Sequence, residues 1–361
     1  MTSVIKQNGL SLIELLIASS IGLFLIGGIY QTFQSTRHAT ILLQAEAEMQ
    51  ENARFAFSIL SASIKKAGDF GCKSSTSQAI TSLLNTNNDT LNPDIYIQGW
   101  EASGSNFGDT YKVKSNSSIS ATTTKHWLDS AGLTKDKGLK SKKDSDILKI
   151  WYTKPYRVNL SSVSNGILTF PALDLENGNI LAINDCESIH FAQVCACEEA
   201  DCDGKENQAE VKSCNKTNSL KGLNLSVSEV AVVEQAIYFI SKRASNKKGY
   251  RNNIPSLYVR HLGKDAKPTP KQEVLEGVES VQFLYGEDTN SDGSVNYYVS
   301  ADSIANWSHV VSLKINLLLR SINNNLTKGH QHLVFNGAPI IVDKNDHYLR
   351  RAFSTTLSLR N

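Results

Sequence analysis

One stretch of the sequence has residue types and spacing that suit a metal ion. Asp288, Asn290 and Asp292 place oxygen-bearing side chains at the first, third and fifth positions of a loop, and Gly293 stands at the sixth. Calcium takes about six to eight oxygen ligands, and its loops use this order of oxygens with a sharp turn at the glycine. The twelfth position, where such loops supply a bidentate Glu, is Val299. The stretch therefore predicts either a weak calcium site or a plain turn between two strands.

The six cysteines are the second group of reactive residues. Their even number suits an oxidising compartment, where cysteines form disulfides. Cys72 and Cys186 stand apart, whereas four cysteines lie close together in the sequence: Cys195, Cys197, Cys202 and Cys214. A zinc site is the alternative for this cluster, but its CxC spacing differs from the usual CxxC pair. The sequence therefore favours disulfides.

The third candidate is a carboxylate inside an apolar run. From Leu10 to Tyr30 there are 21 residues, and Glu14 is the only charged one. A helix of that length spans about 30 Å, the thickness of the hydrocarbon core of a bilayer. An ionisable group in a membrane helix is costly, roughly 2.5–3.5 kcal/mol at its centre, and indicates a function with a partner. A free amine made by cleavage between Gly9 and Leu10 would be that partner.

Two simpler readings explain this run less well. A secretory signal peptide has a shorter apolar core and a small-residue cleavage site, and a plain membrane anchor leaves Glu14 unexplained. The sequence contains no glycine-rich phosphate loop, no nucleophile elbow and no HExxH helix. We therefore expect no catalytic residues and no required cofactor, calcium being the one possible ion.

Charge indicates how the chain is oriented. The net charge is +2 over 361 residues, so no global field argues for binding to nucleic acid. Lys6 precedes the apolar run and Arg37 is the first basic residue after it. The positive-inside rule then favours a cytoplasmic leader, a single pass through the inner membrane and a periplasmic remainder.

The elements that must position these residues follow from periodicity. Apolar residues continue at helical spacing beyond Tyr30: Leu42, Ala45, Met49, Ala53, Ala56, Leu60 and Ile64. Lys65, Lys66 and Gly68 then indicate the end of the helix. Residues 73–146 are rich in Ser, Thr, Asn and Lys and predict long loops.

Strand-like segments follow, rich in β-branched and aromatic residues. They are Ile147–Thr153, Ile180–Asn184, Ile189–Val194, Val230–Ser241, Ser256–His261, Val278–Tyr285, Val310–Leu319 and Ala352–Leu359. Long helical crossovers are missing, so we expect antiparallel pairing. The fold class is α+β, a long helix packed on a mainly antiparallel sheet domain.

The start of the chain resembles a known family. Gly9 followed by Leu-Ser-Leu-Ile-Glu-Leu is similar to the class III leader of type IV pilins and type II secretion pseudopilins, although Leu10 stands where Phe is commonest. The resemblance implies that a prepilin peptidase cuts after Gly9, that Leu10 becomes N-methylated, and that Glu14 meets the N-terminal amine during subunit assembly.

Later segments resemble the PilW family of minor pilins. They are Gly71-Cys72, Ser145-Asp146-Ile147-Leu148, Asn184-Asp185-Cys186, Ser256-Leu257-Tyr258, Glu276-Gly277-Val278-Glu279, Leu284-Tyr285-Gly286, Trp307 and Leu359-Arg360-Asn361. The resemblance implies a leader (1–9), an assembly helix (10–68) and a periplasmic head (69–361) with insertions at 73–146 and 195–218.

It also implies a function. Such proteins join other minor pilins at the pilus tip, prime assembly of the major pilin and support twitching motility, adhesion or DNA uptake, in some cases with a tip adhesin. A type II secretion minor pseudopilin is the alternative within this class. A membrane-tethered periplasmic enzyme or adhesin, from a different class, would retain Met1 to Gly9.

Parity and compartment further predict that Cys72 pairs with Cys186 and that the four clustered cysteines pair among themselves, in one of three ways. Closing the long loop between Cys72 and Cys186 would stabilise the fold by about 4–5 kcal/mol in the chain-entropy model.

Overall fold

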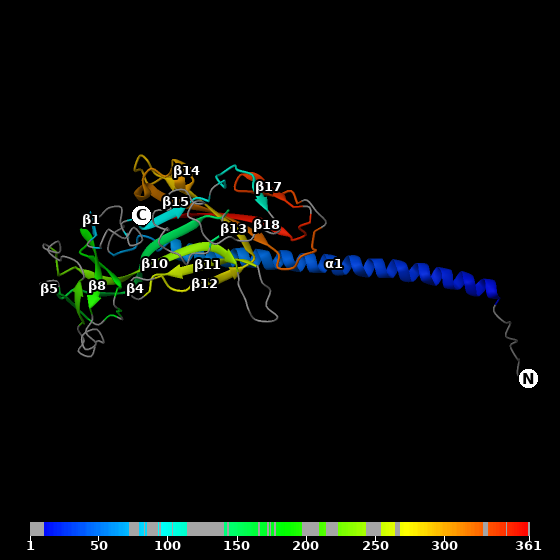
Figure 1. Ribbon diagram of the computed structural model, residues 1–361, viewed down its shortest axis with the longest axis horizontal. Helices are drawn as coiled ribbons and strands as arrows, with labels where there is room; N and C mark the ends of the chain where they lie inside the picture. Colours follow the sequence, from blue (N-terminus) through cyan, green and yellow to red (C-terminus); the bar gives the residue numbers. More distant parts are fainter. Residues whose placement is uncertain are drawn as a thin grey trace, which may run out of the picture.

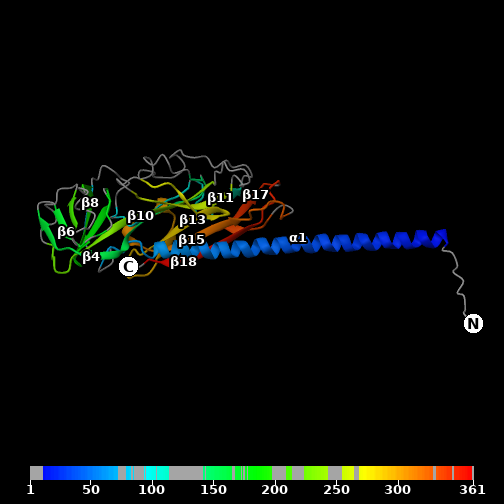
Figure 2. The same ribbon diagram turned by 90° about the horizontal axis from the view of Figure 1, so that it is seen from below.

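The structure is a computed structural model in which one long helix carries a β-rich head. It describes residues 11–71, 79–82, 84, 93, 95–102, 104–113, 141–142, 144–164, 167–171, 173, 175–176, 178–196, 209–213, 223–242, 254–263, 268–327, 331–343 and 345–359. The helix, α1 (Leu12–Ile64), packs on the head with its C-terminal half and projects from it with its N-terminal half (Figures 1 and 2).

The sequence of α1 explains both halves. No proline interrupts the 53 residues of the helix, and its N-terminal half carries apolar side chains in every direction. In the C-terminal half, one stripe is buried at helical spacing: Met49, Ala53, Ala56, Leu60 and Ile64. The predicted helix is therefore confirmed. It ends at Ile64, and Gly68 closes the following turn with a φ of 76°, donating its N–H to the carbonyl of Trp151 at 3.0 Å.

The head contains three sheets in its described part. The largest has the order β12 (Gln272–Glu276), β11 (Pro255–His261), β10 (Glu229–Lys242), β7 (Ile180–Asn184), β8 (Ser188–Ala196), β9 (Ala209–Ser213), β6 (Ile167–Phe170) and β5 (Ser162–Ser164). Beside this row, β1 (Ala79–Ser82) pairs with β8, and β4 (Ile147–Asn159) lies between β10 and β2 (Ile97–Trp100).

The second sheet has the order β14 (Tyr297–Val299), β13 (Val278–Glu287), β15 (Val310–Arg320) and β18 (Arg350–Ser358). The third has the order β16 (Val334–Phe335), β17 (Ala338–Val342) and β3 (Tyr111–Val113). Two short 3-10 helices, η4 (Ala301–Ser303) and η5 (Trp307–His309), connect β14 to β15.

Pairing is antiparallel except between β1 and β8 and between β17 and β3, so the predicted fold class is confirmed. Each predicted strand segment overlaps an observed strand. The structure adds three short strands, β1, β2 and β3, within the region expected to be loops. Their brevity hides the alternation of a strand, although Tyr96, Trp100 and Tyr111 are buried there.

Of the four hydrophobic clusters among the described residues, the two larger ones follow each other along the length of the head. The main core joins the buried stripe of α1 to residues of β4, β10, β13 and β15. A second core, which includes Leu168, Phe170 and Ile183, lies among β5 to β9 and the far ends of β4 and β10. We call this part the distal lobe, since it lies at the opposite end of the molecule from the start of α1 (Figures 1 and 2). The long strands β4 and β10 run through both cores.

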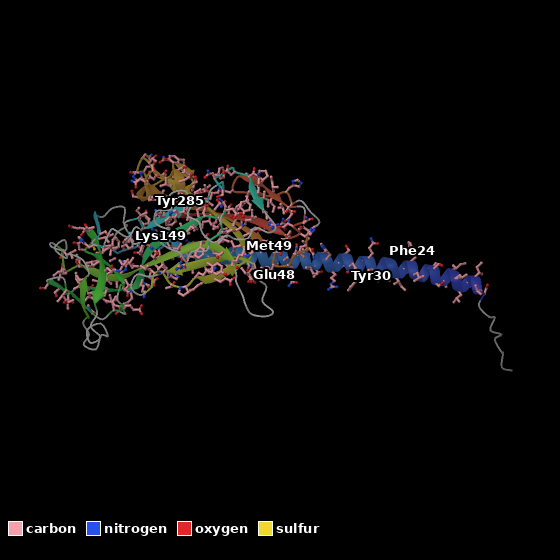
Figure 3. The ribbon with its side chains drawn as sticks, in the orientation of Figure 1. Phe24, Tyr30, Glu48, Met49, Lys149 and Tyr285 are labelled. Carbon is pink, nitrogen blue, oxygen red and sulfur yellow. The ribbon has the colours of Figure 1, made fainter. Side chains whose placement is uncertain are left out.

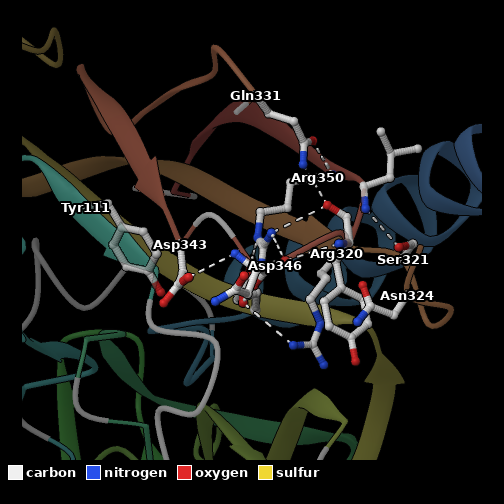
Figure 4. A network of polar contacts seen from close by, with 12 residues as sticks. Tyr111, Arg320, Ser321, Asn324, Gln331, Asp343, Asp346 and Arg350 are labelled. Atoms are coloured by element: carbon white, nitrogen blue, oxygen red, sulfur yellow. Dashed lines mark hydrogen bonds and ion pairs between the residues drawn. The ribbon is translucent and has the colours of Figure 1, made fainter. Parts of the chain in front are cut away.

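A buried ion network fixes the start of β18. The guanidinium of Arg350 is fully buried and donates from Nε to Oε2 of Glu279 at 2.6 Å and from Nη2 to Oδ2 of Asp346 at 2.8 Å. Figure 4 shows Arg350 with Asp346 and Arg320 around it. Burial alone would raise the pKa of Glu279, but the charge of Arg350 outweighs it and lowers this pKa to about 2. The network therefore stabilises the ionised form of Glu279.

Replacing Arg350 tests this network. Arg350→Ala leaves buried Asp346 without its cation and Glu279 with the more distant Arg320, 3.9 Å away, and breaking a buried pair costs roughly 3–5 kcal/mol. Because the pKa of Glu279 is depressed, its contribution is present above pH ~4.5 and is lost as the pH falls toward 2. The free energy of unfolding of the full chain in detergent, measured between these pH values, should therefore fall less steeply on acidification for the variant than for the unmodified protein.

Arg351→Ala is the matched control. Arg351 pairs with Glu46 at the partly exposed edge of the same strand, where an ion pair contributes at most about 1 kcal/mol. Equal losses of stability in the two variants would contradict the role given to the buried network.

Candidate functional site

In the part of the chain that the structure describes, the N-terminal half of α1 projects free of the head. Its large side chains are exposed, Phe24 at 83% and Leu12 at 76%, and Figure 3 shows Phe24 and Tyr30 projecting from the bare helix while Met49 lies where the helix enters the head. The mean hydropathy reaches 2.2 over an 18-residue window. By length and composition, this helix is able to cross a membrane, and we call its exposed residues 12–36 the apolar segment.

Glu14 lies in the first turn of the apolar segment and faces the start of the helix. Its Oε2 accepts the backbone N–H of Ser11 at 3.0 Å. Gly9 and Leu10 lie outside the described residues. In the sequence, an amine created at Leu10 would belong to the residue next to the amide that Glu14 already accepts. The carboxylate is therefore oriented toward the end of the chain where cleavage is predicted to place a positive charge.

A shallow groove interrupts the apolar segment at Gly28. It is lined by Phe24, Leu25, Gly28, Ile29, Thr32, Phe33 and Thr36. A Cβ added at Gly28 would meet no atom within 4 Å, so nothing within the described part of the chain requires a glycine at this position. Small residues at such a position allow another helix to approach closely in a membrane. The sequence shows Gly28 within the apolar run, and the structure adds the side chains that line the groove around it.

The other half of α1 is tied to the head by polar contacts as well as by its buried stripe. The Ser63 hydroxyl lies 2.6 Å from that of Tyr238 on β10, and Arg351 on β18 pairs with Glu46. The packed half of α1 is therefore held near both of its ends, so the apolar segment has a fixed direction relative to the head.

Asp146, in one of the segments named in the sequence analysis, connects distant parts of the head by hydrogen bonds. Asp146 accepts the backbone N–H groups of Ala102 at 3.0 Å and Phe283 at 2.8 Å, joining two sheets. Burial raises the pKa of Asp146 to about 8 and that of nearby Glu101 to about 9. Neither Glu101 nor the buried cation Arg350 was identified from the sequence. A carboxylate or cation beside a strand gives no signal of its burial before the strands are assembled.

The cysteine predictions fall largely outside the described residues. Cys186 is disulfide-bonded and has a φ of 68°, and the cysteine side chain bonded to it lies outside what the structure describes. Gly71 packs against Asn184, two residues before Cys186: a Cβ on Gly71 would lie 2.1 Å from the side-chain nitrogen of Asn184. The Asn184 amide in turn donates to the carbonyl of Phe70 at 3.1 Å. This contact places Gly71 beside the residue two before Cys186, and the pairing of Cys72 with Cys186 stays a prediction.

The remaining cysteines stay untested. Cys72, Cys197, Cys202 and Cys214 lie outside the described residues, and of Cys195 only the backbone, within β8, is described.

The loop at Asp288 is closed by its own hydrogen bonds. Asp288 accepts the N–H of Asp292 at 3.2 Å and of Gly293 at 2.7 Å, and Asp292 accepts the N–H of Ser294 at 2.7 Å. Gly293 has a φ of 82°, as the predicted turn requires. Among the described residues, no group of three or more His, Cys, Asp and Glu is placed to hold a metal. Calcium binding at Asp288, Asn290 and Asp292 therefore stays a prediction.

A β-rich head on a long helix, with an apolar free half and a carboxylate in its first turn, defines a type IV pilin-like protein. Residues 5–30 match the prokaryotic N-terminal methylation motif. Residues 237–361 match PilW, described as type IV pilus-assembly protein W. From residue 237 to its end, the chain is similar to the PilW family of type IV pilus-assembly proteins. No curated protein and no solved structure matches it.

The two matches indicate the class of protein. PilW is a structural pilin family. The leader implies prepilin peptidase and the pilus machinery as partners, and the leader with the apolar helix indicates a prepilin anchored in the inner membrane. The PilW match extends from β10 to the end of the chain and includes Glu279 and Arg350.

The groove at Gly28 gives a first prediction for this site. Gly28→Leu should leave the fold intact, because nothing lies within 4 Å of an added Cβ and leucine favours a helix by about 0.5–1 kcal/mol over glycine. It should nevertheless reduce the amount of the protein in sheared pili several-fold, because it fills the groove. Gly22→Leu, outside the groove and equally free of neighbours, is the control. Equal incorporation of both variants would contradict a role for the groove.

Peptide mapping tests the cysteine pairing. Digestion of the full chain without reduction should yield a peptide joining Cys72 to Cys186, with the other four cysteines joined among themselves. Finding Cys186 joined to Cys195, Cys197, Cys202 or Cys214 would reject the pairing.

Calorimetry tests the loop at Asp288. With three side-chain oxygens and one backbone carbonyl the ligand set is incomplete, so we expect weak binding, about 10⁻⁴–10⁻³ M as in extracellular modules. The full chain in detergent should give heat on titration with calcium, and Asp292→Ala should not. A flat titration to millimolar calcium, with an unchanged melting temperature, would leave only a turn.

Proposed function

We propose that this protein is a minor pilin that primes or caps type IV pilus assembly at the pilus tip, and so supports twitching motility, adhesion or DNA uptake. The observation that carries the proposal is the apolar segment, which is exposed, carries Glu14 in its first turn and is held in a fixed direction by the head. Such a surface is stable only in lipid or against other apolar helices.

The mechanism is binding. In the inner membrane the apolar segment lies in lipid, and on assembly it exchanges lipid for the helices of the major pilin and of other minor pilins. Glu14 then pairs with the N-terminal amine of Leu10, on its own or on a neighbouring subunit, so that neither charge is buried alone. A type II secretion minor pseudopilin would share this mechanism, and the PilW match favours the pilus.

The shape of the head supports the tip position. The distal lobe lies beyond the C-terminal end of α1, on the side away from the membrane (Figures 1 and 2). In a fibre, the next subunit outward would occupy this direction. A lobe there suits a subunit at the end of the fibre, where it would face a tip adhesin or a surface.

The test combines processing with assembly. Mass spectrometry of the protein from sheared pili should find a chain that begins at N-methylated Leu10, and Gly9→Val should leave an uncut precursor in the membrane. Glu14→Ala should be cleaved normally but enter pili poorly, by roughly tenfold if the pair contributes about 1.4 kcal/mol.

Glu51→Ala, which removes an exposed carboxylate from the packed half of the same helix, is the control and should assemble normally. An intact leader on protein from pili would support the tethered enzyme or adhesin instead.

A further inference from the structure

Among the described strands, none pairs with the outer edge of β18. β18 pairs with β15 on one side through nine residue pairs without a register shift, and it is the last strand of its sheet. The N–H of Leu359 donates to the carbonyl of Val311, the residue directly opposite. Hydrogen-bonded pairs alternate along an antiparallel ladder. The backbone N–H and C=O groups of the odd-numbered residues of β18 therefore bond β15, and those of the even-numbered residues point away from β15, toward the outer edge.

Within the described part of the chain, an outward N–H of β18 has a partner at the start of the strand. The N–H of Arg350 donates to Oε1 of Gln331 at 2.9 Å. Among the described residues, none accepts the N–H groups of Ala352, Ser354, Thr356 and Ser358, and Ser354, Thr356 and Ser358 are exposed. The edge is therefore open from Ala352 to the end of the strand.

The end strands β12, β14 and β5 offer poorer edges. β12 carries Glu273 and Glu276 and has an irregular register, while β14 and β5 are only three residues long. In contrast, Ala352 to Leu359 contains no charged residue, proline or bulge. A long, regular and uncharged edge tends to pair with another chain unless it is covered.

From this edge we infer that β18 accepts an extended strand from another subunit of the same pilus, which continues the four-stranded sheet. The inference rests on the proposed function, because its partner is a subunit gathered around the same helix. β18 lies along the packed half of α1 and contacts it through Arg351 and Glu46. A neighbour that packs on α1 is therefore beside this edge.

The two faces of β18 specify the chemistry of the added strand. Phe353 and Leu357 pack against the main core, whereas Ser354, Thr356 and Ser358 are exposed on the opposite face. Neighbouring strands place like-facing side chains side by side. The partner segment is therefore uncharged, with apolar residues alternating with Ser, Thr or other small polar residues, and its backbone supplies most of the affinity.

A second copy of β18 does not fit this position. Antiparallel pairing of two copies would relate them by a two-fold axis perpendicular to the strand, and their α1 helices would then point in opposite directions, although both must start in one membrane. Parallel pairing of two copies would place the two helices on opposite faces of the joined sheet. A different segment, from another subunit, meets neither obstacle.

Site-specific photo-cross-linking in cells that make pili tests the inference. A photoreactive amino acid at Ser354 of the full chain should give a cross-link to a protein that carries its own N-terminal methylation motif, as identified by mass spectrometry. The same probe at Glu273, on the end strand β12, should give no such product. A cross-link from Ser354 only to a second copy of this chain, to a protein without that motif or to no protein would overturn the inference.

Variants at Thr356 separate this contact from folding and from helix assembly. Thr356→Pro removes one outward N–H, which an edge strand tolerates, and Thr356→Lys places a charge on the edge. Both should abolish the cross-link from Ser354 while the melting temperature stays unchanged, and Thr356→Val should retain it. A cross-link that persists in Thr356→Lys would overturn the inference and leave the proposed function standing. Normal piliation with Glu14→Ala would instead count against the proposed function.

Discussion

The buried stripe of α1, which runs from Met49 through Ala53, Ala56 and Leu60 to Ile64, is the contact on which both ends of the molecule depend. Its members pack into the main core with residues of β4, β10, β13 and β15. Burial of a leucine or isoleucine side chain contributes about 1.5–3 kcal/mol, and the two alanines let the helix lie close to the sheets. Without this contact the head would lose one wall of its core, and the apolar segment would lose its fixed direction.

The helix and strands whose apolar residues recur at a regular spacing over many residues could be predicted from the sequence. The helix follows from an unbroken apolar run and a stripe at helical spacing, and β10, β13 and β15 follow from long β-branched and aromatic segments. The short strands β1, β2 and β3 could not, because three or four residues carry no readable alternation. They form where already assembled strands offer them a partner, which is information held by the tertiary structure.

The residues of the candidate site also fall into two groups, those that could be predicted from the sequence and those that could not. Gly9, Leu10 and Glu14 were visible because their chemistry is local, a leader followed by one carboxylate in an apolar run. The buried groups Glu101, Asp146 and Arg350 depend on residues far away in the chain: Asp146 meets Phe283, and Arg350 meets Glu279. A sequence shows that such residues are charged, but it does not show which charge will face them.

These buried polar groups help to specify how the strands of the head are aligned. A buried ion pair contributes little net stability, since desolvation of the charges offsets their attraction, but it strongly disfavours any arrangement that separates them. Arg350 requires Glu279 and Asp346 beside it, and Asp146 requires the amides of Ala102 and Phe283. Together they fix the register of β18 and of β13 relative to β2, which apolar packing alone would leave less defined.

The alignment of β18 with α1 also has a mechanical consequence. A pull on α1 from the membrane, resisted at the far end of the head, acts along the direction of β18 and β15 (Figures 1 and 2). Their nine facing residue pairs then experience shear, in which all of the hydrogen bonds between the two strands resist together. A pull across the strands would instead open them one at a time. Because survival under force is governed by the rate of unfolding, this orientation suits a subunit that must stay folded while a fibre is under tension.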